Sequence, residues 1–391
     1  MANFRILALD GGGSWALIQV MALIDLYGES ATGHEVLSSF DLAAANSGGS
    51  IVLGGLVENM TLSDLLAFFL SLEKRKSVFV EKFHLPDTPK YITEKKLDGL
   101  MAALPQRGAW PMPQAAADIR SAATGAPLHL LMIGFDYDRN CSRFFRSMPA
   151  TGASWGNGDP AQVRLADAIH ASSTAPVLFF DKPAELPSEP GKRYWDGAIS
   201  GCNNPVLAAA AEAIVLGQSP NSIRALSLGT GTVCLPPAPA GGSSAVFYAS
   251  MPNPGLLSDF EKLAGAIVDD PPDASSFLAH VLTGGSPGLA APVDSRVVRM
   301  SPMISPVRDA SGNWSLPQGL DETAFHALAN LAMDAVEQDQ VDSIQNVAGL
   351  WLQDQVRNQP IRMGGNLSRE LGQDWHSEAK QAWLNLRSES V

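Results

Sequence analysis

The sequence predicts an α/β fold in which helices cover both faces of a largely parallel sheet. Apolar runs of strand length alternate along the chain with segments whose apolar residues recur at helical spacing. Glycine-rich turns follow two of these strands, at residues 11–13 and 229–231. A third turn, at residues 45–49, leads from strand to helix with a serine between small residues. Such a turn holds the serine hydroxyl out from the edge of the sheet.

The composition is that of a soluble globular protein, with 46% hydrophobic and 17% charged residues in a chain of 391. A net charge of −13 argues against nucleic-acid binding and against general adhesion to anionic membranes. Three widely spaced cysteines form neither a disulfide framework nor a metal-ligand pattern, which indicates a reducing compartment. The N-terminus has no leader pattern, and no apolar run reaches the roughly 18 residues of a membrane span. We therefore expect a cytoplasmic protein that is at most peripheral at membranes.

The first strand covers residues 4–9 and leads through Gly11, Gly12 and Gly13 into a helix that begins at Leu17 and stops near Gly28. A glycine turn before a helix directs several backbone N–H groups at one point, and the helix dipole adds to the attraction for an anion. Three interpretations are open. The turn is an oxyanion hole, a dinucleotide-binding turn of the form Gly-x-Gly-x-x-Ala ending at Ala16, or a tight turn without a ligand.

The dinucleotide interpretation requires an acidic residue at the end of the second strand, about 20 residues further on. Glu29 and Glu35 precede the second strand, which we predict at residues 40–44, and Asp41 lies within it. The fit to a dinucleotide site is therefore poor.

The second strand leads into the serine turn, which has the form of a nucleophile elbow. Its residues are Ala45, Asn46, Ser47, Gly48 and Gly49. Small neighbours let the strand and the next helix approach closely, so Ser47 is the candidate nucleophile. Turns of this composition are common in α/β proteins, so the assignment depends on the motifs further along the chain.

A helix capped at Thr61 should run to Leu72 and end at the basic residues 74–76, which form either a solvated face or a contact with lipid headgroups. Prolines divide residues 84–115 into loops and short helices. A strand at 128–136, a small-residue helix from 165 to Pro176 and an Asp-Gly-Ala turn at 196–198 come next. A helix then ends near residue 214, and another strand occupies 223–232.

Beyond residue 233 the amino-acid composition changes. Residues 235–255 are rich in Pro, Gly, Ser and Ala and form a long loop with the character of a lid. Helices are expected at 256–268, 274–282 and over most of 322–352, with a strand at 296–300. We predict one domain over residues 1–355, with its core at 4–233, a loop and helical region at 235–355, and a polar helical extension at 356–391.

Three motifs in this order resemble the patatin-like phospholipase family, whose signatures are D-G-G-G-x-R-G, G-x-S-x-G and D-G-G/A. The corresponding residues here are 10–16, 45–49 and Asp196-Gly197-Ala198. Supporting matches are the small-residue segment ending at Pro176, the Asn-Asn-Pro at 203–205 and the Ser-Leu-Gly-Thr-Gly at 227–231. Each motif is weak alone, whereas together, in the family's order, they are specific.

The resemblance implies a patatin-type three-layer α/β/α sandwich with a mostly parallel sheet and extra C-terminal helices. It also implies a dyad in which Asp196 takes the proton of Ser47 directly, with the N–H groups of residues 11–13 holding the oxyanion. The activity would be hydrolysis of lipid acyl esters, of the phospholipase A or lysophospholipase type, without metal or cofactor. The expected partner is a lipid or phospholipid, met in transient contact with a membrane surface. A homo-oligomer and a small-molecule or nucleotide activator are compatible with the sequence, although no residue pattern shows either.

Three departures from the signatures affect this interpretation. Ala45 adds one methyl group to the elbow, and Ala16 is a mild change. Trp15 removes the arginine of the family pattern and either lines the acyl site or packs helix on sheet. A catalytically inactive interaction module is therefore an alternative. A histidine triad is another, with candidates after the acid at His280, His326 and His376; His170 lies beside the small-residue segment.

Overall fold

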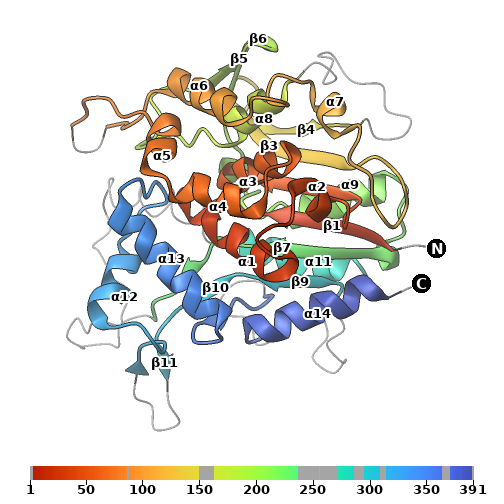
Figure 1. Ribbon diagram of the computed structural model, residues 1–391, viewed down its shortest axis with the longest axis vertical. Helices are drawn as coiled ribbons and strands as arrows, with labels where there is room; N and C mark the ends of the chain where they lie inside the picture. Colours follow the sequence, from red (N-terminus) through yellow and green to blue (C-terminus); the bar gives the residue numbers. More distant parts are fainter. Residues whose placement is uncertain are drawn as a thin grey trace.

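The computed structural model describes residues 3–85, 88–148, 163–236, 255, 271–285, 295–308, 314–362 and 370–389. The centre of the fold is β1 (Phe4–Leu9), an apolar strand that pairs in parallel with β2 (Leu42–Asn46) and β7 (Ile223–Leu228). The order of the eight-stranded sheet is β5-β6-β3-β2-β1-β7-β9, with β4 paired to β3 (Figure 1). The remaining strands are β3 (His129–Asp136), β4 (Cys141–Arg146), β5 (Ala184–Leu186), β6 (Glu189–Asp196) and β9 (Val297–Met300). β3, β2, β1, β7 and β9 run parallel, while β4, β5 and β6 form antiparallel pairs.

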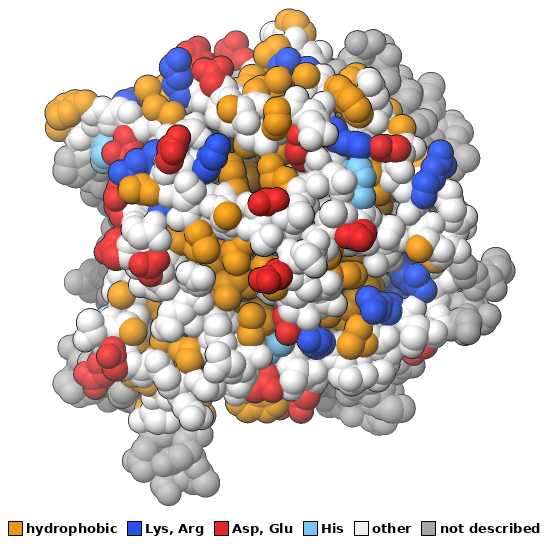
Figure 2. Space-filling view, viewed as in Figure 1, with side chains coloured by type: hydrophobic (Ala, Val, Ile, Leu, Met, Phe, Trp, Pro, Cys, Tyr) orange, Lys and Arg blue, Asp and Glu red, His pale blue; other side chains and the backbone are white. Residues whose placement is uncertain are grey.

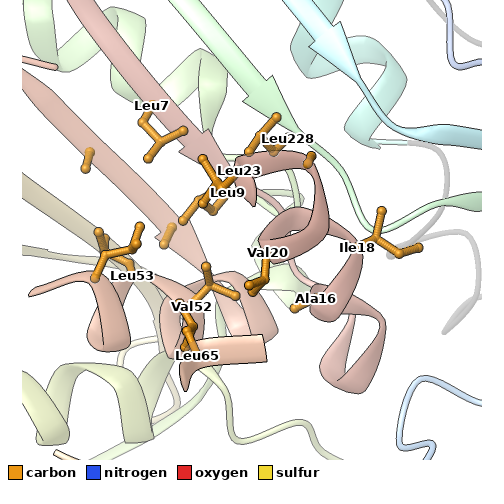
Figure 3. Close-up of a cluster of buried hydrophobic side chains, with 14 of the residues drawn as sticks. Leu7, Leu9, Ala16, Ile18, Val20, Leu23, Val52, Leu53, Leu65 and Leu228 are labelled. Atoms are coloured by element: carbon orange, nitrogen blue, oxygen red, sulfur yellow. The ribbon is translucent and has the colours of Figure 1, made fainter. Parts of the chain in front are cut away.

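Alternate residues of the central strands face two helical layers, because successive side chains of a strand point to opposite faces. Leu7 and Leu9 join a cluster with α1 (Leu17–Tyr27), α3 (Ser47–Val57) and α4 (Leu62–Leu70), as Figure 3 shows. Ile6 and Ala8 join a second cluster with α9 (Val206–Val215) and α11 (Pro271–Leu282). This arrangement confirms the predicted three-layer α/β/α sandwich with a mostly parallel centre.

Smaller elements complete the fold. The short helices are α2 (Gly33–Leu37), α5 (Leu72–Val78), α6 (Thr93–Ala103), α7 (Met112–Ala116), α8 (Leu165–Ser172), η1 (Gly13–Ala16), η3 (Gly197–Ser200) and η4 (Pro220–Ser222). A three-stranded sheet has the order β13 (Arg357–Asn358), β10 (Pro302–Ile304) and β8 (Thr232–Val233). β11 (Val307–Arg308) pairs with β12 (Trp314–Ser315). Most of the loop predicted at 235–255, and the helix predicted at 256–268, lie outside the described residues.

Two local predictions near the N-terminus are wrong. The second strand begins at Leu42, and Asp41 precedes it because its carboxylate accepts hydrogen bonds from the Arg5 N–H (2.7 Å) and the Thr124 hydroxyl (2.8 Å). The helix predicted to run to Leu72 ends at Leu70, and Ser71 caps α5 by accepting from the Lys74 N–H. Residues 74–76 therefore lie inside a helix, with one of them, the central arginine, buried.

The region predicted as helical at 322–352 consists of α12 (Glu322–Ala329) and α13 (Gln338–Leu352), separated by a loop. The break has a local cause, since Glu337 and Gln340 form a capping box that starts α13. We call residues 330–336 the connecting segment. It reaches the glycine turn, where the Ser14 N–H donates to the Met333 carbonyl at 3.0 Å.

The C-terminal extension contains α14 (His376–Ser388), as predicted, and one face of this helix is buried. Trp383 is fully buried and stacks on Phe40 with ring centroids 5.7 Å apart. The two ends of the chain lie side by side (Figure 1), and the Asn3 amide donates to the Glu389 carbonyl at 2.9 Å. The apolar residues of α14 explain this packing, since their spacing places them on one stripe.

None of the helices in the described part of the chain is both long enough and apolar enough to span a bilayer. On the face drawn in Figure 2, acidic and basic side chains are interspersed with hydrophobic ones.

Replacing Trp383 with alanine tests whether α14 belongs to the core. The substitution leaves a cavity against Phe40, so we expect the free energy of unfolding to fall by about 3–5 kcal/mol, measured by denaturant titration. Gln381→Ala, on the exposed side of the same helix, is the control and should change stability by less than about 0.5 kcal/mol. Equal effects of the two substitutions would show that α14 is not part of the core.

Candidate active site

The edge of β3 brings the serine turn and the aspartate turn together. Asn46, the last residue of β2, pairs with Ile133 of β3, and Asp196, the last residue of β6, pairs with Gly134. β4 pairs with β3 across both positions, so β2 and β6 share the opposite edge of β3, one after the other. β2 is parallel and β6 antiparallel to β3, and their carboxyl ends therefore meet at adjacent residues.

Ser47 begins α3 directly after β2 and has a φ of +48°, a left-handed conformation that is uncommon outside glycine. This conformation turns the chain sharply from strand to helix, as an elbow requires. Gly48 lets the glycine turn pack closely against the elbow. A Cβ on this residue would lie 3.1 Å from the Ala16 Cβ and 2.8 Å from the Gly13 nitrogen. The Ser47 N–H donates to the Ser172 hydroxyl at 3.1 Å, which holds the elbow against α8.

Asp196 is buried and held by two hydrogen bonds. Its carboxylate accepts from the Asn46 amide at 3.1 Å and from the Ala198 N–H at 2.9 Å. Burial raises the pKa of Asp196 above its usual value, and the nearby Ser47 side chain, the two hydrogen bonds and the charge of Lys96 counteract part of this rise. The structure thus brings together the predicted serine and aspartate with Asn46 as a bridge between them.

The glycine turn lies beside the elbow, but its three N–H groups are not equivalent. The Gly11 N–H donates to the Asn203 carbonyl at 2.9 Å, so it is engaged within the fold. Gly12 and Gly13 have no backbone acceptor for their N–H groups among the described residues. The Gly11 N–H would have to give up this hydrogen bond to serve as an oxyanion donor, whereas the N–H groups of Gly12 and Gly13 would not.

Gly48 is a candidate donor that the sequence interpretation missed. Its N–H lies in the first turn of α3, where backbone N–H groups have no acceptor within the helix. A Cβ on Gly48 would lie 2.8 Å from the Gly13 nitrogen, so the two backbones are adjacent. In elbows of this type the residue after the nucleophile usually donates to the oxyanion, so the motif itself could have identified Gly48.

Ser47 lines a small cavity of about 20 Å³. Its other walls come from the glycine turn, from the helices after it, and from two aromatic residues of the loop after α8. These lining residues are Gly13, Gly48, Ile51, Phe79, Lys96, Ser173, Ala175, Phe179, Phe180, Met333 and Asp334. The residues from the connecting segment and Lys96 were not predicted, because only the packing of distant elements places them here.

A second cavity, of about 290 Å³, lies on the other side of the connecting segment, and Met333 borders both. Trp15 lines this larger cavity rather than the one at Ser47, and its indole N–H donates to the Ala332 carbonyl at 3.3 Å. Asp10 and Arg299 form a buried ion pair in its wall, with a separation of 2.6 Å. Burial raises the pKa of Asp10 to about 6, although Arg299 acts to lower it.

The sequence left a histidine triad and a dinucleotide site open as alternatives, and the geometry matches neither. Within the described part of the chain, no hydrogen bond joins Ser47 or Asp196 to a histidine, and His376 binds Asp25 at 2.9 Å instead. The residue after β2 is Ser47 rather than the acidic residue of a dinucleotide site. The described residues also contain no group of three His, Cys, Asp or Glu side chains that could hold a metal ion.

Comparisons with known proteins identify the family of this chain. The family model of patatin-like phospholipases matches residues 7–210, more than half of the chain. An intracellular phospholipase A2 from Caenorhabditis elegans is 27% identical over 209 residues, which make up 53% of this chain and 16% of that protein. The solved structure of VipD from Legionella pneumophila aligns with 89% of this chain and 67% of its own, at 10% identity and a TM-score of 0.32, too low to carry an argument. The match of the family model shows that this chain belongs to the patatin-like phospholipases.

Proposed function

We propose that the protein hydrolyses acyl esters of lipids, as a phospholipase A or lysophospholipase, through an acyl-serine intermediate on Ser47. The observation that carries the proposal is the meeting of Ser47 and Asp196 at the adjoining ends of β2 and β6, where the Ser47 side chain acts to lower the pKa of the carboxylate. A serine hydroxyl is a weak nucleophile unless a base removes its proton during attack, and Asp196 is in place to be that base. The name of the curated relative supports a phospholipid as substrate.

The proposed reaction has two halves. Ser47 Oγ forms a bond to the ester carbonyl carbon, its proton passes to Asp196, and the carbonyl electron pair moves onto the oxygen. Collapse of this intermediate breaks the bond to the alcohol, which takes the proton from Asp196 and leaves. A water molecule then attacks the acyl-serine while giving a proton to Asp196, and the release of fatty acid returns that proton to Ser47.

The N–H groups of Gly12, Gly13 and Gly48 would hold the oxyanion. Gly13 and Gly48 line the cavity at Ser47, and Gly12 directly precedes Gly13 in the glycine turn. None of the three N–H groups has a backbone acceptor among the described residues. In serine hydrolases each such donor contributes about 3–4 kcal/mol to stabilisation of the transition state. Backbone donors need no reorganisation when the charge develops, which makes them efficient.

Acyl chains would enter along the apolar walls of the small cavity, formed by Ile51, Phe79, Phe179 and Phe180. The cavity volume of about 20 Å³ is too small for an acyl chain, so the walls must separate when a lipid binds. The loop that carries Phe179 and Phe180 and the connecting segment are the two walls that do not belong to the sheet or its helices.

An exposed apolar rim continues from this loop. Val177 and Leu178, which precede the two phenylalanines, are more than a third exposed, as are Phe83 (92%) and Leu85 (61%). The two segments are joined, since the Lys90 N–H donates to the Leu178 carbonyl at 3.2 Å. We propose that this rim makes the transient contact with the lipid surface that presents the substrate.

Replacing Ser47 with alanine tests the nucleophile. We expect turnover of a short-chain nitrophenyl ester, and labelling by a fluorophosphonate, to fall by at least about a thousandfold, because no other hydroxyl lies on the elbow. Asp196→Asn should lower both rates similarly, while Ser63→Ala, an exposed serine on α4, is the control and should keep them. A labelled, active Ser47→Ala variant would remove the assignment.

The pH profile of kcat/KM tests the base. Asp196 acts only when ionised, and its pKa is raised, so activity should fall as the pH drops through a value above the ordinary aspartate value of about 3.9. Below that point the rate should fall about tenfold per pH unit. Tryptophan fluorescence at each pH separates this loss from unfolding. An acid limb at or below the ordinary value would contradict the proposal.

Replacing Phe83 with serine tests the rim. We expect binding to phosphatidylcholine vesicles, measured by sedimentation, to weaken by about tenfold, because a fully exposed aromatic side chain is lost from the interface. Hydrolysis of a soluble short-chain ester should stay the same. Val215→Ser removes another exposed apolar residue, on α9, and serves as the control. Equal vesicle binding by all three proteins would exclude the rim as the contact surface.

A further inference from the structure

Lys96 is a fully buried cation in the wall of the Ser47 cavity. It lies on α6 with 1% of its surface exposed. Its ammonium donates to the Thr174 hydroxyl at 3.1 Å and to the His170 carbonyl at 3.4 Å. The same ammonium lies 4.6 Å from the ring centroid of Phe180, which lines the cavity. The proposed reaction of Ser47 and Asp196 does not use this group.

Burial of an ammonium is costly, and nothing in the surroundings of Lys96 offsets that cost fully. No carboxylate in the described part of the chain lies within 4 Å of its nitrogen. A buried ion without a close partner is destabilising by several kcal/mol, and an apolar side chain of similar volume often packs better. The neighbouring Lys95, by contrast, is exposed and pairs with Asp98. The position of Lys96 is therefore better explained by the site than by stability.

The charged and titratable groups around Lys96 come from three other elements. Asp196, at the end of β6, interacts with it electrostatically. On α8, His170 is buried, and burial together with the charge of Lys96 lowers its pKa well below the usual value, so its ring stays neutral. Asp334 lines the same cavity but is engaged by Lys90 at 3.0 Å and the Tyr91 hydroxyl at 2.8 Å. Asp196 is thus the carboxylate left for Lys96 to act on.

We propose that Lys96 is a positioning residue of this site, whose charge keeps Asp196 ionised before reaction and balances the oxyanion during it. This inference rests on the proposed function. When Ser47 attacks, its proton neutralises Asp196 and the negative charge moves to the oxyanion, so the site carries one negative charge throughout. Lys96 lines the cavity together with Gly13 and Gly48, whose N–H groups would hold that oxyanion. A cation beside both positions lowers the energy of the charge before and after transfer.

Burial and Asp196 act on Lys96 in opposite directions. Burial lowers the pKa of Lys96 well below its usual value and so favours the neutral amine, while the charge of Asp196 opposes that shift and favours the ammonium. The same interaction lowers the pKa of Asp196. Each group therefore favours the ionised form of the other, and loss of the cation should make Asp196 harder to ionise.

The test compares the full-length wild-type protein with Lys96→Met and Lys96→Gln. The rate of Ser47 labelling by a fluorophosphonate is measured against pH, with circular dichroism as the check of folding. We expect the acid limb to move to higher pH in both variants, with labelling below the limb slower by on the order of tenfold per unit of movement. KM for a neutral short-chain ester should not change, because Lys96 acts through Asp196.

Lys95→Met is the matched control on the same helix, since it removes an exposed charge beside the buried one. It should reproduce the wild-type profile. Methionine and glutamine both remove the charge but differ in polarity, so the buried position should accept at least one of them. The pH profile of a variant that folds gives the result. Slower labelling with an unshifted limb would give Lys96 a structural role only and overturn the inference while the proposed function stands. A wild-type protein that is not labelled at Ser47 would remove the proposed function, and the role of Lys96 with it.

Discussion

The site depends on one constraint of strand pairing: β2 and β6 occupy the same edge of β3, end to end. Because β2 runs parallel and β6 antiparallel to β3, both chains leave the sheet at neighbouring residues, Ile133 and Gly134. The elbow and the aspartate turn therefore start from one point, although 150 residues separate Asn46 from Asp196. The hydrogen bond between these two side chains fixes their relative position. Without this pairing, neither turn alone would form a site.

Several features of the site are energetically unfavourable, and packing elsewhere in the fold must offset their cost. Ser47 has a left-handed backbone conformation, and Asp196 and Lys96 are buried ionisable groups. Local strain and buried charges are common at functional sites, where they support reactivity rather than stability. The large cluster around Leu7 and Leu9, which holds β1, α1 and α3 together, provides the rigid frame that keeps these features in place.

Much of the fold could be predicted from local patterns, because apolar periodicity determines which face of each central element is buried. The three motifs also located Ser47 and Asp196, since their order along the chain is specific. The failures are non-local. The Gly11 N–H is engaged by Asn203, which no local pattern reveals. Lys96 lies in a run of charged residues that suggests a solvated helix face, and only the packing of α6 on α8 buries it. Leu328, Leu331 and Ala335 recur at helical spacing, so the local pattern does not show the break before α13.

The location in the cell, the oligomeric state, the membrane contact and any activator stay predictions. We propose that Ser47, Asp196 and the glycine turn form one hydrolytic site, and a crystal structure of the fluorophosphonate adduct is the sharpest test of that proposal. We expect phosphorus bonded to Ser47 Oγ, with the phosphonyl oxygen within hydrogen-bond distance of the N–H groups of Gly12, Gly13 or Gly48. Phosphorus on another residue, or a phosphonyl oxygen directed away from these donors, would contradict it.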